Sequence, residues 1–222
     1  MPLRGKAFRL SEPTARLEAF SDGVFAIAIT LLVLELRAPD REVASSNDAL
    51  WAALGALWPS YLAFVLSFFV VLVMWVNHHH FMRMLRRVDN PFLFANGLLL
   101  LVVTFIPFPT AVLAEHLDTP SSRAAVVFYC ATFVGASLTW TLLLDVTIRR
   151  GLLGPDVSAD TVRRLRRANT VGPIVYAIAT VIAFFNALAG LAVNVSLWVL
   201  WMTLRHHRSG THASEAARTS TP

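Results

Sequence analysis

Long uncharged stretches alternate with short charged clusters along this chain, and the stretches have the length of membrane-spanning helices. A helix needs about 20 mostly apolar residues to cross a hydrocarbon core of about 30 Å. Four such stretches cover residues 20–36, 49–76, 91–114 and 124–144. The first is short and contains Asp22, Thr30 and Glu35, which makes it polar for a span. The pattern predicts an all-α membrane protein.

A fifth stretch, residues 168–204, has no charged side chain and is too long for a single crossing. As one helix it would extend about 55 Å, at about 1.5 Å per residue, against a core of about 30 Å. It must therefore turn back, and residues 186–190 are the expected hairpin between spans near 171–187 and 190–205. The expected architecture has six transmembrane helices. Pro107 and Pro109 are expected to kink or end the third of them.

The lysines and arginines give the expected direction of insertion. If the N-terminus lies in the cytoplasm, only Arg37, Arg41 and Arg123 of the 19 lysines and arginines fall outside. Such an excess on one side is the positive-inside signal of membrane proteins. We therefore expect a multi-pass protein of the cell membrane with both termini in the cytoplasm.

Composition supports a lipid environment and excludes several other classes of protein. Apolar residues make up 56% of the chain and charged residues 15%, whereas an ordinary globular protein has about 25% charged residues. The net charge of +5 could suggest nucleic acid, but the basic residues flank apolar segments, so no nucleic-acid partner is expected. The single Cys130 excludes a disulfide framework and a cysteine-based metal cluster.

Three regions are expected: a cytoplasmic N-terminal segment at 1–15, a six-helix transmembrane domain at 16–205 and a disordered cytoplasmic tail at 206–222. Within the domain, the inner loop at 147–170 contains six arginines, four of them close together at positions 163, 164, 166 and 167. Ser158 or Asp160 is expected to cap a short helix that carries them. Such a helix most simply rests on anionic lipid headgroups, and a dedicated ligand site is the alternative.

The first predicted span concentrates the candidate chemistry, because ionisable residues inside a membrane are costly and usually functional. At 3.6 residues per turn, Phe20, Val24, Ile27, Leu31 and Leu34 share one face of this helix, and Thr30 lies beside them. From the residues alone, such an apolar stripe is most often a packing face.

The same residues resemble the opening motif of the transmembrane protein 175 family of potassium channels, in its prokaryotic single-repeat branch. The string is Arg16-x-x-x-Phe20-Ser21-Asp22, followed by Ala26-Ile27-x-x-Thr30-Leu31-Leu32-x-Leu34. Two later strings are similar to the segments at the end of the family's second and third helices: Trp75-x-x-His78-His79-x-Phe81 and Phe105-x-Pro107-Phe108-x-Thr110. Order, spacing and six-span length agree over residues 16–205.

The resemblance implies a potassium-selective cation channel and not an enzyme. In such a channel the first helices of a homotetramer line the pore, and no cofactor is needed beyond the permeant K⁺. It places Ile27 at the pore constriction, Leu31 and Leu34 at the next apolar rings, and Thr30 at the position associated with potassium preference. The chain has no Thr-Val-Gly-Tyr-Gly filter sequence.

Physical chemistry supports this assignment. Rings of apolar side chains form a throat that water can leave, and dewetting is a recognised way to gate a pore. A cation in the throat sheds part of its hydration shell, which K⁺ does at a lower cost than Na⁺, and Thr30 hydroxyls could supply replacement oxygens. Glu35, with Asp40 and Glu42 just beyond it, is expected to concentrate cations at the outer mouth.

A second group of polar residues is expected near the cytoplasmic end. Arg16, Ser21 and Asp22 lie at the same depth as the three histidines that end the second predicted span. A network among them would compensate the buried carboxylate. The resemblance implies that Arg16, Phe20, Ser21, Asp22, Trp75, His78 and His79 act as struts between helices.

Three consecutive histidines, at 78–80, also raise the possibility of a metal site. Adjacent helical positions point in different directions, and no His-x-x-x-His pair occurs, so no metal site is expected. A zinc site and simple solvation at the interface are the alternatives to the network.

Two other functions are alternatives to a channel. A metal-dependent integral-membrane enzyme would use His78–His80 with an acidic partner, but no metal-ligand spacing, nucleophile elbow or phosphate loop supports it. A proton-coupled secondary transporter would use Asp22 and Glu35 as its carboxylates. The sequence shows no inverted repeat and no pair of helices broken by Gly or Pro in its two halves.

Overall fold

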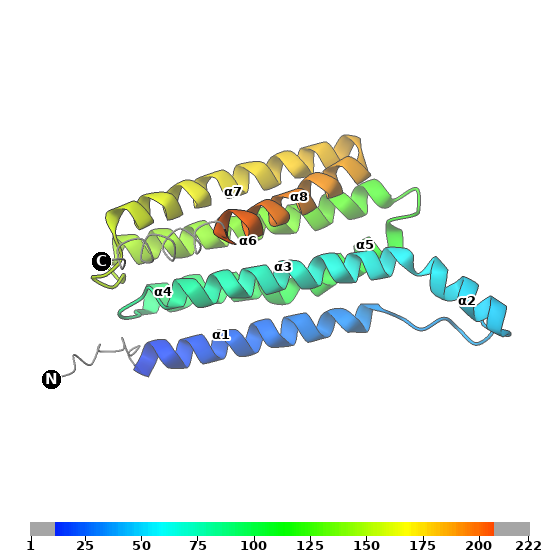
Figure 1. Cartoon of the computed structure of the whole chain (residues 1–222), viewed down its shortest axis with the longest axis horizontal. Coiled ribbons are helices and arrows are strands. Elements are labelled where there is room, and N and C mark those ends of the chain that lie inside the picture. The colour runs from blue at the N-terminus through cyan, green and yellow to red at the C-terminus, as the bar shows by residue number, and fades with distance from the viewer. Residues whose placement is uncertain (1–11, 207–222) are drawn as a thin grey trace, which may run out of the picture.

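The computed structural model describes residues 12–206, and the side chains of 13–196, as a bundle of helices aligned along one long axis (Figure 1). In chain order the elements are α1 (Glu12–Leu31), a 3₁₀ turn η1 (Leu32–Glu35), α2 (Asn47–Ala56), α3 (Trp58–Met82), α4 (Asn90–Phe105), α5 (Pro107–His116), α6 (Ser122–Arg149), α7 (Ala159–Phe185) and α8 (Ala187–His206). The expected all-α class is confirmed.

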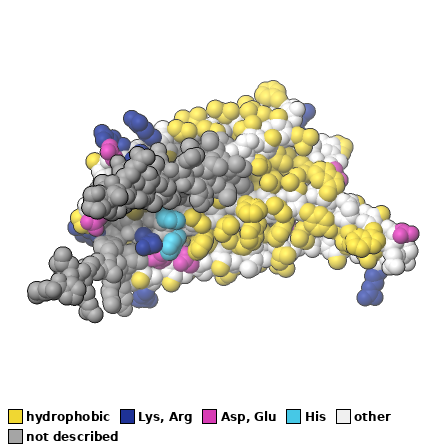
Figure 2. Space-filling view, viewed as in Figure 1, with side chains coloured by type: hydrophobic (Ala, Val, Ile, Leu, Met, Phe, Trp, Pro, Cys, Tyr) yellow, Lys and Arg dark blue, Asp and Glu magenta, His cyan; other side chains and the backbone are white. Residues whose placement is uncertain are grey.

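Five helical segments are long and apolar enough to cross a membrane: Pro13–Glu35, Trp58–Met82, Asn90–His116, Ser122–Arg149 and Ala159–Phe185. The sixth expected span corresponds to α8, which returns beside α7 and whose described side chains, in Ala187–Ser196, are mostly apolar (Figure 1). Hydrophobic side chains cover the middle of the molecule, and arginines lie toward its two ends (Figure 2). This distribution matches a bilayer between two aqueous phases.

The predicted span at 49–76 is wrong in its first part. The helix is interrupted at Leu57, and α2 projects past the ends of the other helices (Figure 1). Pro59 lies in the first turn of α3. A proline is tolerated there because the backbone N–H groups of a first turn have no acceptor within the helix. Only α3 crosses, and it continues to Met82, six residues beyond the predicted end.

The third span is interrupted at Ile106, between α4 and α5. Pro107 and Pro109 have no backbone N–H to donate to the preceding turn, and two such losses close together favour an interruption of the helix. The Thr110 hydroxyl donates to the Ile106 carbonyl (2.8 Å) and lies 2.7 Å from the Ser67 hydroxyl, which is 3.0 Å from that of Tyr129. This buried cluster connects α3, α5 and α6.

The inner loop at 147–170 is shorter than expected. Ser158 caps α7 by accepting a hydrogen bond from the Thr161 N–H (3.2 Å), and α7 then continues without interruption to Phe185. The arginines therefore sit on the first turns of a spanning helix, and the expected separate surface helix does not form.

The expected hairpin between the last two spans is a single residue, Asn186. Its side chain accepts a hydrogen bond from the Ala189 N–H (3.0 Å) and so caps α8. Gly190 allows the two helices to approach closely, because a Cβ at this position would lie 2.3 Å from the Cβ of Ala183 on α7.

The expected terminal segments fall largely outside the described residues. Residues 1–11 and 207–222 are not described, so the expectations for 1–15 and for the disordered tail at 206–222 stay predictions. Where the chain is described, α1 begins at Glu12, four residues before the expected start of the domain, and α8 ends at His206.

The arginine-rich ends of the helices are joined by loop contacts. Asp89 caps α4 by accepting from the Phe92 N–H (3.1 Å), and its second oxygen accepts from Arg150 Nε (2.8 Å) at the end of α6. The hydrogen bond from Arg150 lowers the pKa of the Asp89 carboxyl below its usual value, because it stabilises the ionised form. The Arg86 N–H also donates to the Leu152 carbonyl (3.0 Å).

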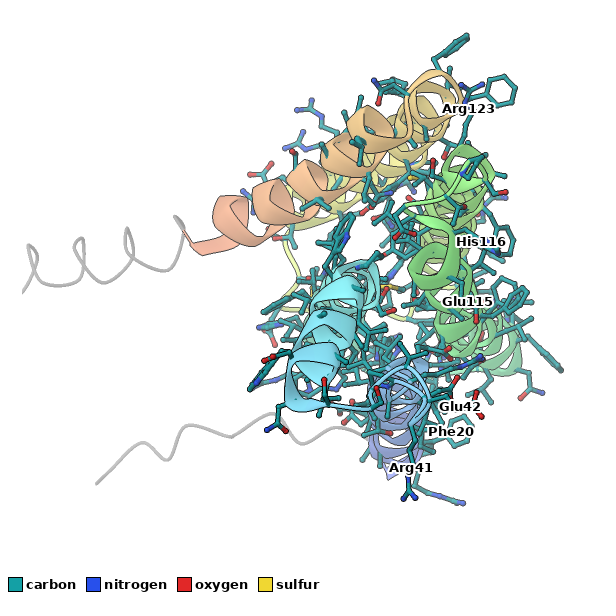
Figure 3. All side chains as sticks on the ribbon, turned by 90° about the vertical axis from the view of Figure 1, so that its right-hand side faces the viewer. Phe20, Arg41, Glu42, Glu115, His116 and Arg123 are labelled. Atoms are coloured by element: carbon teal, nitrogen blue, oxygen red, sulfur yellow. The ribbon has the colours of Figure 1, made fainter. Side chains whose placement is uncertain are left out.

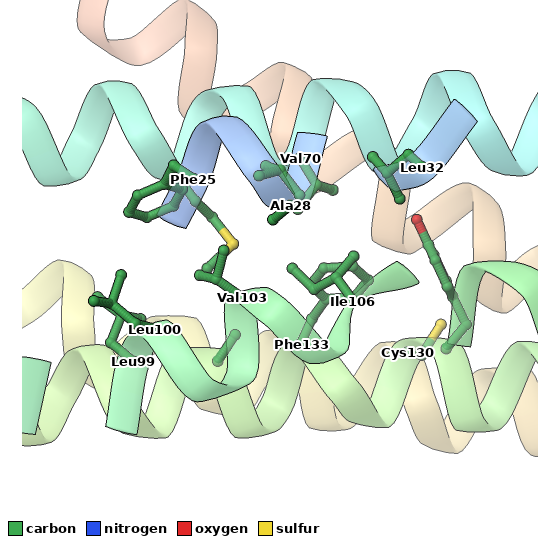
Figure 4. Close-up of a cluster of buried hydrophobic side chains, with 14 of the residues drawn as sticks. Phe25, Ala28, Leu32, Val70, Leu99, Leu100, Val103, Ile106, Cys130 and Phe133 are labelled. Carbon is green, nitrogen blue, oxygen red and sulfur yellow. The ribbon is translucent and has the colours of Figure 1, made fainter. Parts of the chain in front are cut away.

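The hydrophobic core lies where α1, α3, α4 and α6 meet (Figure 4). Phe25 and Ala28 of α1 and Leu32 of the adjoining η1 are fully buried there. They face Val70 of α3 and Val103 of α4, with Ile106 filling the break between α4 and α5. One face of α1 is therefore fixed by packing against the rest of the chain.

We predict that Gly190→Ala destabilises the protein by about 1–3 kcal/mol, the usual cost of overpacking. The added methyl group collides with Ala183, so α7 and α8 must move apart. Gly135→Ala on α6 is the control, because its Cβ would meet no atom within 4 Å. Thermal unfolding in detergent measures both. Equal stability of the two variants would contradict the close approach of α7 and α8.

Candidate pore-lining face and its supporting network

Helix α1 has two faces in different environments. One face, formed by Ser21, Phe25, Ala28 and Leu32, is buried completely against α3 and α4. The other carries the apolar stripe found in the sequence. Phe20 is 63% exposed, Ile27 58%, Leu31 41% and Leu34 68%.

The stripe therefore does not pack inside this chain, so the packing face expected from the residues alone would have to meet a surface outside it. Only Val24, at its edge, is half-buried. Viewed along the bundle, Phe20 lies at the edge that α1 forms (Figure 3). An exposed apolar row on a membrane helix must be covered by lipid or by another protein surface.

Thr30 lies beside the stripe and is exposed. Its hydroxyl donates a hydrogen bond to the Ile27 carbonyl (2.9 Å). A hydroxyl oxygen that donates its proton still has two lone pairs, so Thr30 can offer an oxygen to a cation.

Acidic residues gather at the end of the bundle where α1 and η1 end. Glu35 is half-buried and lines a cavity of about 290 Å³ together with Glu115 and Asp118. Arg37 also lines this cavity and lies 3.5 Å from the Glu115 carboxylate. The neighbouring Asp40 and Glu42 are exposed, and Figure 3 shows Glu42 and Glu115 at this end.

A chain of hydrogen bonds connects the buried face of α1 to α3 and α4. His78 Nε2 donates to Asn96 Oδ1 (2.8 Å), the Asn96 amide donates to the Ser21 hydroxyl (3.1 Å), and that hydroxyl donates to the Leu17 carbonyl (2.9 Å). His78, Asn96 and Ser21 are almost fully buried. Their polar groups are costly to bury alone, so each fixes the position of the next.

A second pair of contacts connects α1 to α3. The Trp75 indole N–H donates to the Asp22 carboxylate (2.9 Å). His79 Nδ1 lies 2.9 Å from Glu18 Oε1, and the His79 ring stacks on Trp75. Asp22 and Glu18 are one helical turn apart, so both contacts lie on the same side of α1.

Most of the expected network residues are thus brought together, with two exceptions. Phe20 lies in the exposed apolar stripe. Arg16 is exposed and forms no ion pair with the described part of the chain. Two participants were missed. Asn96 and Glu18 were not predicted, although the spacing of four residues between Glu18 and Asp22 puts both on the same helix face.

The three consecutive histidines have three different partners. His78 contacts Asn96, His79 faces Glu18, and His80 Nδ1 contacts the Val76 carbonyl (2.6 Å). One possible metal-ligand group exists among the described residues: donor atoms of Glu18, Asp22 and His79 lie within 4.8 Å of one another. Only one of the three histidines belongs to it.

Comparison with known proteins places this arrangement in context. Residues 16–107 match the family model described as "Endosomal/lysosomal potassium channel TMEM175". The chain is 43% identical over 182 residues to "Potassium channel Cha6605_3372" of Chamaesiphon minutus, which covers 81% of this chain and 89% of that protein. It is also 43% identical to "Potassium channel B446_29190" of Streptomyces collinus, over 82% of this chain and 87% of the relative.

The fold has a counterpart among solved structures. The crystal structure of a lysosomal potassium-selective channel TMEM175 homolog from Chamaesiphon minutus superposes with a TM-score of 0.77 at 40% identity, over 88% of this chain and 98% of that one. The structure of the MtTMEM175 T38A variant shares the fold, with a TM-score of 0.59 at 21% identity.

We predict that Asn96→Leu destabilises the protein by about 1–3 kcal/mol, because it leaves His78 Nε2 and the Ser21 hydroxyl buried without their partner. His78→Phe should remove part of this penalty. The double variant His78→Phe/Asn96→Leu is therefore expected to lose less stability than the two single variants together, as measured by thermal unfolding in detergent. Additive losses would show that the two side chains are not coupled.

Proposed function

The chain belongs to the TMEM175 family of potassium channels, and on that premise we propose that it conducts K⁺ passively through a pore lined by α1 from each subunit of a homotetramer. The observation that carries this proposal is the exposed row of Ile27, Leu31 and Leu34 on the helix whose opposite face is locked in the core. One chain has too few helices to enclose a pore and shield it from lipid, whereas several copies of α1 around an axis enclose one.

Lipid could cover an apolar row equally well, so the other residues on α1 matter. Asp22, Thr30 and Glu35 accompany the row along the same helix, and Thr30 is exposed beside it. A purely lipid-facing helix gains nothing from polar residues at these depths. An ion pathway does, because it needs oxygen atoms near the constriction and negative charge at the mouth.

The gate in this proposal is the set of apolar rings. Ile27 forms the constriction, and Leu31 and Leu34 form the next rings toward the outside. Water leaves a sufficiently narrow apolar throat, and a cation cannot follow without losing its hydration. Widening the rings, or making them polar, lowers this barrier.

Selectivity in this proposal comes from partial dehydration near Thr30. K⁺ holds its hydration water less tightly than Na⁺, so the loss of the same number of water molecules costs K⁺ less free energy. The Thr30 hydroxyl oxygens replace some of the lost water oxygens. Such a site replaces fewer waters than a complete carbonyl cage and should select less sharply. Glu35 raises the local cation concentration at the outer mouth.

The network supports α1 from behind. Ser21 and Asp22 tie the pore helix to α3 and α4 through Asn96, His78 and Trp75. His79 adds a contact through Glu18. We assign the remaining motif residues, Arg16 and Phe20, to the same inner part of α1; both are exposed in the single chain and so are available to neighbouring subunits.

We further propose that the channel domain spans residues 16–205 in the cell membrane, with both termini cytoplasmic, and that it needs no cofactor or resident metal. The excess of arginine at one end of the bundle supports this orientation. Proton-coupled transport and metal-dependent catalysis have less support, because the bacterial relatives are named potassium channels.

The direct test is K⁺ flux from liposomes that contain the purified protein. Ile27→Asn makes the constriction polar and is expected to speed K⁺ flux roughly ten-fold, which corresponds to a barrier about 1.4 kcal/mol lower. Leu101→Asn is the matched control, because Leu101 is an aliphatic residue of similar exposure (63%) on α4. It should leave the flux unchanged. Absence of flux in the parent protein, or no effect of Ile27→Asn, would refute the proposal.

Thr30→Ala tests the selectivity step separately. It should lower the preference for K⁺ over Na⁺ while K⁺ flux persists, because the hydroxyl oxygens are lost and the apolar rings remain. Reversal potentials of the reconstituted channel measure this ratio. A ratio equal to that of the parent protein would remove Thr30 from the selectivity mechanism.

A further inference from the structure

Three possible metal ligands converge between α1 and α3, on the side of α1 turned away from its exposed apolar row. Donor atoms of Glu18 and Asp22 on α1 and of His79 on α3 all lie within 4.8 Å of one another. Spacing along one helix predicts no metal site among residues 78–80, and it could not predict a group that two helices assemble. Two carboxylates and one imidazole are a ligand set that suits divalent transition-metal ions such as Zn²⁺.

The separations between the donor atoms fit the coordination of one ion. Zn²⁺ binds imidazole nitrogen and carboxylate oxygen at about 2.0–2.2 Å, so two neighbouring ligand atoms lie about 2.8–3.6 Å apart in tetrahedral or octahedral geometry. His79 Nδ1 and Glu18 Oε1 are 2.9 Å apart, within this range. The other separations do not exceed 4.8 Å, so rotation of a flexible carboxylate side chain is enough to close them.

The two carboxylates lack a lysine or arginine partner. The Glu18 side chain is only 12% exposed, and neither Glu18 nor Asp22 forms an ion pair with a lysine or arginine of the described residues. His79 Nδ1 is buried and makes no hydrogen bond within the described part of the chain, although Glu18 lies beside it. Buried carboxylates are costly unless they are paired or coordinate a metal. A cation held between the three side chains removes this cost.

Trp75 holds two of the three ligands in position. Its indole N–H donates to Asp22 Oδ1 (2.9 Å), which leaves the second carboxylate oxygen available for an ion. Its ring also stacks on the imidazole of His79, with the ring centroids 6.0 Å apart. Hydrogen bonds from residues outside the ligand set orient the ligands of metal sites in the same way. The group is therefore ordered before an ion arrives.

An ion can reach the group from solution. All three side chains are half-buried, and His79 lies in the last turn of α3, close to the end of the span. Figure 2 shows histidine and acidic side chains near one another on the surface toward this end of the molecule.

We propose that Glu18, Asp22 and His79 bind a divalent transition-metal ion, for which Zn²⁺ is the probe, and that the ion fastens α1 to α3. Water completes the coordination shell, because three protein ligands leave a position open. The ion exchanges with solution and is not needed for conduction. Its regulatory effect rests on the proposed function: an ion that fastens the pore helix restrains the movement that widens the apolar rings, and so slows K⁺ flux.

The first test measures metal binding and does not need flux. The full chain in detergent, without a histidine tag, is titrated with ZnCl₂ or MgCl₂ in a calorimeter. The parent protein should bind Zn²⁺ more tightly than Mg²⁺, because Mg²⁺ prefers an octahedral shell of oxygen atoms. His79→Gln should weaken Zn²⁺ binding roughly ten-fold or more, because it removes a ligand. His80→Gln is the matched control at the next position, outside the group, and should leave the affinity unchanged.

The second test addresses the support from Trp75. Trp75→Phe keeps an aromatic ring beside His79 but removes the N–H that orients Asp22, and should weaken Zn²⁺ binding roughly ten-fold. Saturating Zn²⁺ should also raise the unfolding temperature of the parent protein, because the ligands come from two helices. Glu18→Gln should abolish this rise, and it serves as the ligand variant if His79→Gln fails to fold.

The third test measures K⁺ flux from liposomes. Zn²⁺ should slow flux through the parent protein and through His80→Gln, but not through His79→Gln. The proposal is overturned if the parent does not bind Zn²⁺, if His79→Gln and His80→Gln bind it equally, or if bound Zn²⁺ leaves the flux of the parent unchanged. Absence of any K⁺ flux in the parent would instead refute the proposed function, and the binding measurements would still decide whether the metal site exists.

Discussion

The packing of one face of α1 against α3 and α4 is the interaction on which the rest of this structure depends. In a bilayer, polar groups must find partners within the protein, and apolar surface gains little from leaving lipid. Phe25, Ala28 and Leu32 supply the close packing, and Ser21 adds a hydrogen bond to Asn96. Once this face is fixed, the direction of the opposite face is determined, and Ile27, Leu31 and Leu34 must point away from their own subunit.

The polar contacts of α1 and its exposed apolar row occupy different parts of the helix. The polar contacts of α1 lie near one end, where Asp22 meets Trp75 and Glu18 meets His79. The exposed apolar row occupies the middle and the other end. If Ile27, Leu31 and Leu34 line a pore as proposed, small movements of α1 would change its wetting, because side chains in a narrow apolar throat need to shift only by a fraction of their own size. The network limits such movement.

Much of this arrangement could be predicted from the sequence, because hydropathy, proline and charge asymmetry act locally. The spans other than the one at 49–76 and the break at Pro107 follow from composition and period. The break at Leu57 was not predicted from the uncharged stretch at 49–76, although Pro59, in the first turn of α3, is a local signal for it. The partners of Ser21 and His79 were also out of reach, because Asn96 and Glu18 meet them only through the tertiary fold.

Cysteine cross-linking between subunits tests the central claim most directly. In a Cys130→Ala background, Leu34→Cys should form disulfides between copies in the membrane under mild oxidation, because α1 helices meet around one axis. Phe94→Cys on α4, which is 78% exposed, is the control and should stay monomeric. Cross-linked species from Leu34→Cys and none from Phe94→Cys would support the account. A monomer from Leu34→Cys would contradict it, because the row would then face only lipid.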